Sequence, residues 1–264
     1  MKQFTVKNLK KLSVAVCALG ILAGALVLPV KAMAAETDSS ATIKLPVPYT
    51  KDGITVKEAL DRRRSSRQFT DAPLQEKQLS ALLWAADGIN RPESGKRVHP
   101  TTKGVYNIDV YAVMANGIYK YDPAAHALKL VSPMDFRSQI NEKQTFVHKA
   151  PLTLFYVANP VPPRDPSRPV NPERQHANNC LVAGTMLQSV ALVAVDEGLG
   201  TCVRGSIDRE AFRKAAGLSP EQTVLISQTI GALPGRERET GWAGEEKRSA
   251  LFIPVRRKMK SSCI

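Results

Sequence analysis

Four arginines and two serines stand together in the segment Arg62–Arg67 (RRRSSR). A guanidinium presents a planar fork of N–H donors that suits phosphate oxygens, and a serine hydroxyl adds a further hydrogen bond. Four cations this close repel one another unless an anion neutralises some of them. The segment therefore indicates an anion site, and the alternative is a solvated basic face at the end of a helix.

A second segment, Gly198–Gly205 (GLGTCVRG), carries three glycines. Glycine lets the backbone approach a flat ligand closely. The match to a dinucleotide-binding fingerprint is poor, because the third glycine comes too late and a helix is expected where a strand should precede it. Taken alone, the pattern favours a helix C-cap followed by a turn.

Other residue types indicate little further chemistry. The four histidines, His99, His126, His148 and His176, show no zinc-ligand spacing, so no metal site is expected. Cys202 has no recognisable base and is expected to be a small core residue. No side chain stands out as a catalytic acid or base.

Hydrophobic periodicity predicts the elements that must position these segments. Helices are expected at Val56–Arg63, Gln75–Ala86, Asp135–His148, Asn178–Leu199 and Asp208–Gly217, and strands at Tyr106–Met114, Ile118–Tyr121, Ala127–Val131, Pro151–Ala158 and Thr223–Ile230. Asn116-Gly117 is a hairpin signal, whereas Asn90–Gly104 and the proline-rich Asn159–Pro172 are expected to be irregular. This order predicts an α+β domain.

The first 34 residues have the three-part pattern of a secretory signal peptide. Lysines and no acids precede an apolar run at Leu12–Val30, and Ala32-Met33-Ala34 gives a small-x-small cleavage site. The alternative is an uncleaved membrane anchor, since the run is long enough to span a bilayer. Export to the periplasm or the extracellular space is therefore predicted. We divide the chain into a signal peptide (1–34), a flexible extension (35–52) and one folded domain (53–264).

Composition excludes several classes of protein. The 264 residues are 43% hydrophobic and 23% charged, which excludes a disordered or collagen-like chain. Only three of the four cysteines follow the signal segment, so the domain is not a disulfide scaffold. The formal net charge of the chain is +13, and five of the lysines that contribute to it lie in the first 34 residues. Aromatic residues make up 6% of the chain, which offers no stacking platform for nucleic acid.

The predicted helix Asn178–Leu199 is apolar on nearly all sides, as in a core or subunit-interface helix. Gln188, Asp196 and Glu197 interrupt it below the length of a membrane span, so no stable membrane insertion is expected after signal cleavage. A monomer would expose much of this helix, which favours a homodimer.

Taken in order, five pieces of the sequence resemble the nitroreductase family of FMN-dependent oxidoreductases, in particular the branch of SagB-type dehydrogenases. They are Arg63–Phe69 (RRSSRQF), Leu79–Pro92 (LSALLWAADGINRP), His99–Thr102 (HPTT) before Tyr106–Tyr111 (YNIDVY), Gly198–Thr201 (GLGT) and Ile230–Pro234 (IGALP). The resemblance runs from about Val56 to Pro234. It implies a nitroreductase-like α+β fold, with a central, mostly antiparallel sheet flanked by helices, of the obligate-dimer type.

The resemblance also implies a set of FMN-binding residues. Arg63, Arg64, Ser65 and Arg67 match the segment that holds the phosphate and the ribityl chain, and Thr101 and Thr102 match the segment that lines the flavin from the partner subunit. Arg204 and Gly205 stand where relatives set a backbone N–H against flavin N5, and Arg248 or the adjoining Lys247 is the candidate for a late basic residue at the phosphate. Gly104 departs from the family pattern, which commonly has asparagine there.

The sequence thus predicts an exported FMN-dependent oxidoreductase that transfers hydride or electrons through N5 to a small organic acceptor in a ping-pong cycle. NAD(P)H is the donor that the resemblance suggests, whereas an exported protein would need another reductant. The alternative function is a flavin-free secreted binding protein or structural dimer that keeps the fold. Absorbance of the purified protein separates these functions.

Overall fold

The computed structural model describes residues 42–48, 53–163, 167 and 170–235. The signal peptide predicted over residues 1–34, most of the extension and Arg248 lie outside the described residues. The two cofactor-binding segments predicted around Arg63 and Gly205 lie within them. The fold of this region can therefore be compared with the sequence predictions.

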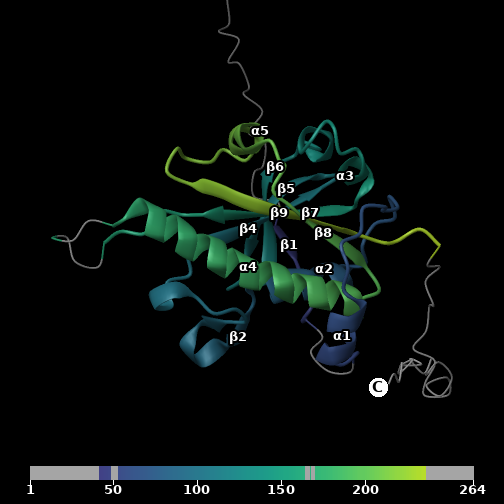
Figure 1. Cartoon of the computed structure of the whole chain (residues 1–264), viewed down its shortest axis with the longest axis horizontal. Coiled ribbons are helices and arrows are strands. Elements are labelled where there is room, and N and C mark those ends of the chain that lie inside the picture. Colours follow the sequence, from purple (N-terminus) through teal and green to yellow (C-terminus); the bar gives the residue numbers. More distant parts are fainter. Residues whose placement is uncertain (1–41, 49–52, 164–166, 168–169, 236–264) are drawn as a thin grey trace, which may run out of the picture. The chain divides into compact units, whose positions relative to one another are not determined.

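A seven-stranded sheet forms the centre of the domain (Figure 1). Its strands are β1 (Thr42–Lys44), β4 (Ile108–Met114), β5 (Gly117–Asp122), β6 (Ala127–Ser132), β7 (Leu152–Ala158), β8 (Gly200–Arg204) and β9 (Thr223–Gly231). Their order in space is β1-β6-β5-β4-β7-β9-β8, and each neighbouring pair is antiparallel. The antiparallel α+β fold predicted from the sequence is confirmed.

Alternating side chains in β4 serve two separate cores, one on each face of the sheet. Val110 and Ala112 belong to the core that α2 (Glu76–Asp87) and α4 (Pro172–Asp196) cover. Tyr111 and Val113 belong to the other core. Because neighbouring residues of a strand point to opposite faces, one strand can serve both cores.

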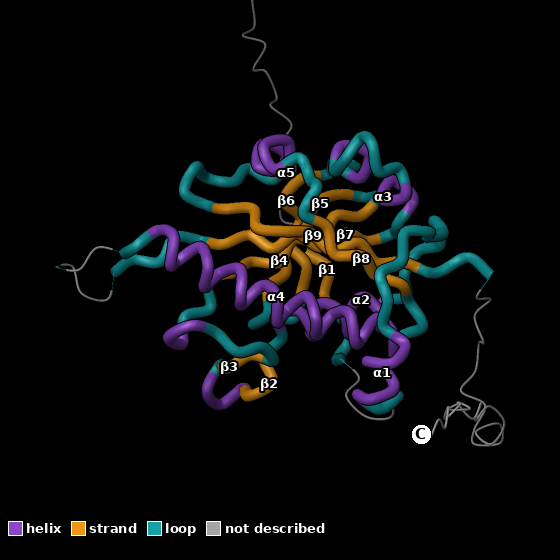
Figure 2. Tube along the Cα trace, in the orientation of Figure 1, coloured by secondary structure: helices purple, strands orange, loops and turns teal. Residues whose placement is uncertain are grey.

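Aromatic rings dominate the second core, which α5 (Arg209–Ala215) helps to cover. Phe212 of α5 stacks on Phe155 of β7 with the ring centroids 3.9 Å apart, and Phe136 packs against both rings. Figure 2 shows α2 and α4 on one side of the strands and α3 (Phe146–Lys149) and α5 on the other. The sheet thus lies between two layers of helices, as the sequence predicted.

The predicted β4–β5 hairpin forms, but its two-residue turn is Ala115-Asn116, one residue earlier than predicted, and Gly117 begins β5 opposite Met114. Gly117 has a φ of +144°, and a Cβ atom built there would lie 2.5 Å from the carbonyl oxygen of Ser132. A larger residue is therefore excluded both by the backbone conformation and by the neighbouring strand.

The segment Asp135–His148 is not the single helix predicted from the sequence. It forms two short turns of helix, η3 (Arg137–Gln139) and α3, separated by a loop. Asn141 explains the interruption, because its side-chain Oδ1 accepts hydrogen bonds from the backbone N–H groups of Lys143 and Gln144 at 2.9 Å. Asparagine competes in this way with helical hydrogen bonds.

Three further segments differ from the predictions. Residues 200–204, predicted as a turn, form the edge strand β8. Thr42–Lys44, within the predicted flexible extension, form β1 beside β6. The stretch Asn90–Gly104 contains the small hairpin of β2 (Ile89–Arg91) and β3 (Lys96–Arg97), with the short helical turns η1 (Pro92–Ser94) and η2 (Thr102–Gly104).

The long helix α4 buries one face and exposes the other. It starts at Pro172, six residues earlier than predicted, with Asn171 as N-cap accepting a hydrogen bond from the N–H of Arg174. Leu181 keeps 70% of its surface exposed, and Gly184 lies on the same open side. By length and composition α4 could cross a membrane, but an apolar core helix of a soluble protein meets the same criteria.

Candidate active site

The arginine segment leaves α1 (Val56–Arg62) in an extended conformation and lies along the start of β8. Arg63 caps the helix through its N–H to the carbonyl of Ala59. Ser65 then forms a parallel bridge with Thr201, and the N–H of Ser66 donates to the carbonyl of Thr201 at 2.9 Å. The fold thus brings together the two segments that the sequence singled out separately.

Gly200 makes this approach possible. A Cβ atom at this position would lie 2.9 Å from Cβ of Ser66 and would overlap the side chain of Leu233. Gly200, the second glycine of the GLGT motif, is therefore required for packing, because the absence of a side chain there lets Ser65 and Ser66 lie directly against β8.

Three of the four arginines carry no ion pair to another described residue. Arg62 pairs with Glu58 one turn back along α1, whereas Arg63, Arg64 and Arg67 pair with none of the described carboxylates. Arg63 is half-buried, and Arg64 and Arg67 are exposed. The guanidiniums of Arg63, Arg64 and Arg67 thus have no carboxylate partner among the described residues, and Nε of Arg64 donates to the carbonyl of Arg62 at 3.3 Å.

At the other end of β8, Arg204 is buried and Gly205 is exposed. The Arg204 side chain donates from Nε and Nη2 to Oε1 of Gln144 at 2.9 and 2.8 Å, and from Nη2 to the carbonyl of Ser206 at 3.1 Å. Its guanidinium also lies over the ring of Phe146, 5.4 Å from the centroid. Burial lowers the pKa of Arg204 from its ordinary value, but guanidinium stays protonated at neutral pH.

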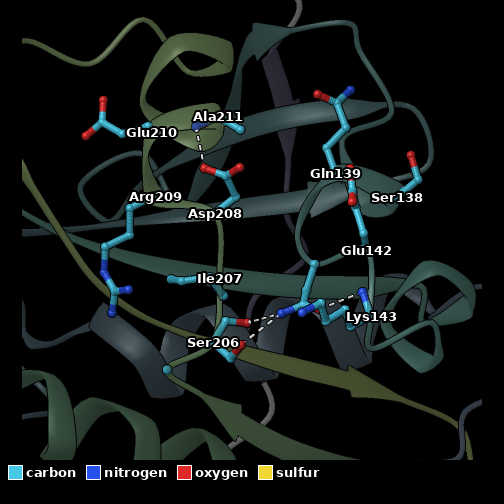
Figure 3. Close-up of a pocket in the computed structure, with 12 residues that line it drawn as sticks. Ser138, Gln139, Glu142, Lys143, Ser206, Ile207, Asp208, Arg209, Glu210 and Ala211 are labelled. Atoms are coloured by element: carbon cyan, nitrogen blue, oxygen red, sulfur yellow. Dashed lines mark hydrogen bonds between the residues drawn. The ribbon is translucent and has the colours of Figure 1, made fainter.

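A pocket of about 930 Å³ opens beside Gly205 (Figure 3). One wall comes from residues 138–143, including Asn141 and Lys143, and the other from residues 205–211. Asn141 joins the walls, since its Nδ2 donates to the carbonyl and the hydroxyl of Ser206 at 2.9 Å each. The pocket gives an organic molecule room next to the exposed backbone of Gly205.

The predicted threonine segment lies elsewhere in the chain. Thr101 and Thr102 follow the hairpin β2–β3, which lies apart from α1 in Figure 2. Thr101 donates its hydroxyl to the carbonyl of Val105, and Gly104 has a φ of +75°. A glycine suits that backbone conformation better than the asparagine that relatives commonly have.

A buried charge cluster holds the start of the threonine segment. Asp87, at the end of α2, pairs with Arg97 and lies 2.8 Å from Nε2 of His99. Arg97 stacks over the ring of Tyr106, and Nδ1 of His99 lies 2.8 Å from the carbonyl oxygen of Pro100. These contacts fix the backbone immediately before Thr101.

The sequence analysis does not identify Asp87, Gln144 or Asn141 as site residues. It predicts one continuous helix over Asn141 and Gln144, and such a helix gives their side chains no reason to contact Arg204 or Ser206. For Asp87, the available signal in the sequence is an acidic residue at the end of an amphipathic helix. Among the described residues no group of three or more His, Cys, Asp or Glu side chains is arranged to hold a metal ion.

Comparison with known proteins identifies the class to which this fold and site belong. The sequence model of the Nitroreductase family matches residues 60–232, well over half of the chain. The chain belongs to the nitroreductase family, and with it to the oxidoreductases. The more specific assignment to the SagB-type branch stays a prediction.

Individual relatives agree with this assignment. A protein of Methanocaldococcus jannaschii named as a nitroreductase is 27% identical over 194 residues, covering 70% of this chain and 95% of its own length. A crystal structure of a nitroreductase homologue from Ralstonia eutropha is 36% identical, with a TM-score of 0.66 over 74% of this chain and 91% of its own. The NADPH:FMN oxidoreductase of Vibrio harveyi shares the fold at 14% identity, with a TM-score of 0.50 over 78% of this chain and 79% of its own.

Proposed function

We propose that this protein is an exported, homodimeric, FMN-dependent oxidoreductase that reduces a small organic acceptor in a ping-pong cycle. The observation that carries the proposal is the arrangement around β8. Unpaired arginines lie beside its first residues, and the exposed backbone of Gly205, with the adjoining pocket, lies just past its last residue. A ligand that reaches both ends must be elongated, with an anion at one end and a flat group at the other.

The residues present fit FMN. The guanidiniums of Arg63, Arg64 and Arg67 and the hydroxyl of Ser65 would bind the phosphate and the ribityl chain. The N–H of Gly205 would donate to N5, and a side chain at this position is absent, so the ring system can approach the backbone. The fold shared with an oxidoreductase named for NADPH and FMN supports the same choice of cofactor.

In the mechanism, bound FMN supplies the redox chemistry, accepting and returning a hydride or electrons at N5. The chain's own residues bind the cofactor and orient the cofactor and the acceptor. Arg63 and Arg67 anchor the anionic end, the Gly205 N–H orients the reactive edge, and the walls at Asn141 and Ser206 position the acceptor. Thr101, Thr102 and Gly104 would line the cofactor from the partner subunit, and Arg248 would add charge at the phosphate.

The test is the flavin content of the protein purified from its native compartment. We expect the visible absorbance of an oxidised flavin, with one FMN per chain released on denaturation and identified by mass. A flavin-free protein that does not take up added FMN would favour the alternative, a binding or structural dimer that keeps the fold.

A further inference from the structure

Arg204 is a buried cation without a described counter-ion. Only 4% of its surface is exposed, and its hydrogen bonds go to two neutral oxygens, Oε1 of Gln144 and the carbonyl of Ser206. None of the ion pairs formed among the described residues includes it. Its Nη1 is buried and has no hydrogen-bond partner. A buried charge of this kind is costly unless an opposite charge lies nearby.

The other buried acidic and basic side chains among the described residues do have an ionisable partner. Asp87 lies against both Arg97 and the buried His99. The side chain that Arg204 contacts is instead Gln144, whose amide has the shape of a glutamate side chain but no charge. Among the buried acidic and basic residues that the structure describes, the missing partner is thus specific to Arg204.

The position of Arg204 indicates where its positive charge would stabilise an anion. Its neighbour Gly205 and its partner Ser206 both line the pocket, and Gln144 directly follows the wall residues 141–143. The guanidinium therefore lies just behind the pocket wall. Its field reaches a charge in the pocket or at the Gly205 backbone without direct contact. The pocket lining adds the carboxylates of Glu142, Asp208 and Glu210 and the cations of Lys143 and Arg209, so Arg204 brings the numbers of positive and negative groups around the pocket into balance.

We propose that Arg204 is kept without a counter-ion so that its charge stabilises an anion beside Gly205. The proposal rests on the proposed function, which places the redox centre there. Two sources supply the same chemistry. Reduction by two electrons and one proton leaves one additional negative charge on FMN, and an organic acceptor that carries a carboxylate brings a charge of its own.

The decisive variant is Gln144→Glu. It preserves the size of the side chain and both hydrogen bonds to Arg204, and it adds the missing counter-charge. Arg204→Gln is the second variant, since it removes the cation outright. Lys149→Gln, which removes an exposed charge at the end of α3, is the control for a general loss of positive charge. Thermal unfolding of all three verifies that they fold.

The first arm measures the midpoint potential of bound FMN, with dithionite as reductant and no substrate present. Gln144→Glu should weaken the binding of reduced FMN relative to oxidised FMN about tenfold, which is a fall of about 30 mV for a two-electron couple. Arg204→Gln should act in the same direction. Lys149→Gln should leave the potential within a few millivolts of the parent value, because solvent screens an exposed charge.

The second arm measures binding of benzoate and of uncharged benzamide by calorimetry, with and without FMN. If the acceptor's carboxylate is the anion, the parent should prefer benzoate at least tenfold and Gln144→Glu should abolish the preference. A lowered midpoint potential in Gln144→Glu supports the proposal and identifies reduced FMN as the anion. A lost preference for benzoate in the same variant supports it and identifies the acceptor's carboxylate as the anion.

The proposal for Arg204 would be overturned if the variants left the midpoint potential unchanged and the parent bound benzoate and benzamide equally. A protein that takes up no FMN refutes the proposed function instead, and benzoate binding to the flavin-free chain then decides the role of Arg204 alone.

Discussion

The backbone N–H of Ser66 donates to the carbonyl of Thr201 at 2.9 Å, and together with the bridge between Ser65 and Thr201 this hydrogen bond joins two segments that are far apart in the sequence. It places the arginine cluster at the first residues of β8 while the same strand carries Arg204 and leads to Gly205 at its other end. The proposed cofactor site depends on this placement. Changes that disturb it should affect cofactor binding even when they lie away from the guanidiniums.

Gly200→Ala should disturb it directly. The new Cβ would lie 2.9 Å from Cβ of Ser66, so the arginine segment or β8 must shift. We expect a loss of about 1–3 kcal/mol in the free energy of unfolding, the usual cost of overpacking, and weaker FMN binding. Lys77→Ala on α2 is the control, because Lys77 is exposed and its replacement should change the free energy of unfolding by less than about 0.5 kcal/mol. Denaturant unfolding that finds both variants equal to the parent would contradict this role of Gly200.

Asp87→Ala should destabilise the domain strongly. It leaves Arg97 and the buried His99 without their shared carboxylate, and breaking a buried pair in this way costs about 3–5 kcal/mol. Glu58→Ala, which breaks the exposed pair with Arg62, should cost less than about 1 kcal/mol. Hydrogen exchange should in addition speed up around Thr101 in the Asp87 variant. Equal unfolding free energies for the two variants would show that the cluster does not hold this segment.

Leu181→Glu should convert the proposed homodimer to a monomer. Leu181 is 70% exposed on the open face of α4, and a charge at a buried subunit interface would lack a partner. Val131→Glu, at a less exposed apolar position on β6, is the control. Light scattering at micromolar concentration should give a dimer for the parent and the control. A monomeric parent would refute the homodimer.

Export with cleavage after Ala34 is testable by the intact mass of the protein recovered from its native compartment. The mature chain should begin at Ala35, within a residue. A mass that still includes Met1, found in the membrane fraction, would favour the uncleaved anchor.

The sequence predicted the strands and the long helices well because their apolar residues repeat with a clear period. Ile108, Val110 and Ala112 alternate in β4, and Leu79, Leu82 and Leu83 follow a helical period in α2. These patterns report burial directly. The nitroreductase resemblance depended on the same segments, together with the arginines.

The segments whose secondary structure was predicted wrongly have no such period in their apolar residues. β8 begins with glycine, which has no preference for a strand, and it becomes a strand because β9 and the serines of the arginine segment pair with it. The helix predicted at Asp135–His148 was overridden by hydrogen bonds of Asn141, including those to the distant Ser206. Contacts of this range cannot be read from local sequence. The N-cap at Asn171, followed by proline, was a local signal that the prediction did not use.

The most direct test of the central claim is the affinity of FMN for Arg63→Ala and Arg67→Ala by equilibrium dialysis. Hydrogen bonds to charged groups contribute about 1.5–3 kcal/mol each, so each variant should fold but bind FMN about 10- to 150-fold more weakly than the parent. Arg137→Ala is the control, since Arg137 pairs with Asp135 outside the site, and it should bind FMN as tightly as the parent. Parent-like affinity in both variants would contradict the claim that these arginines hold the phosphate.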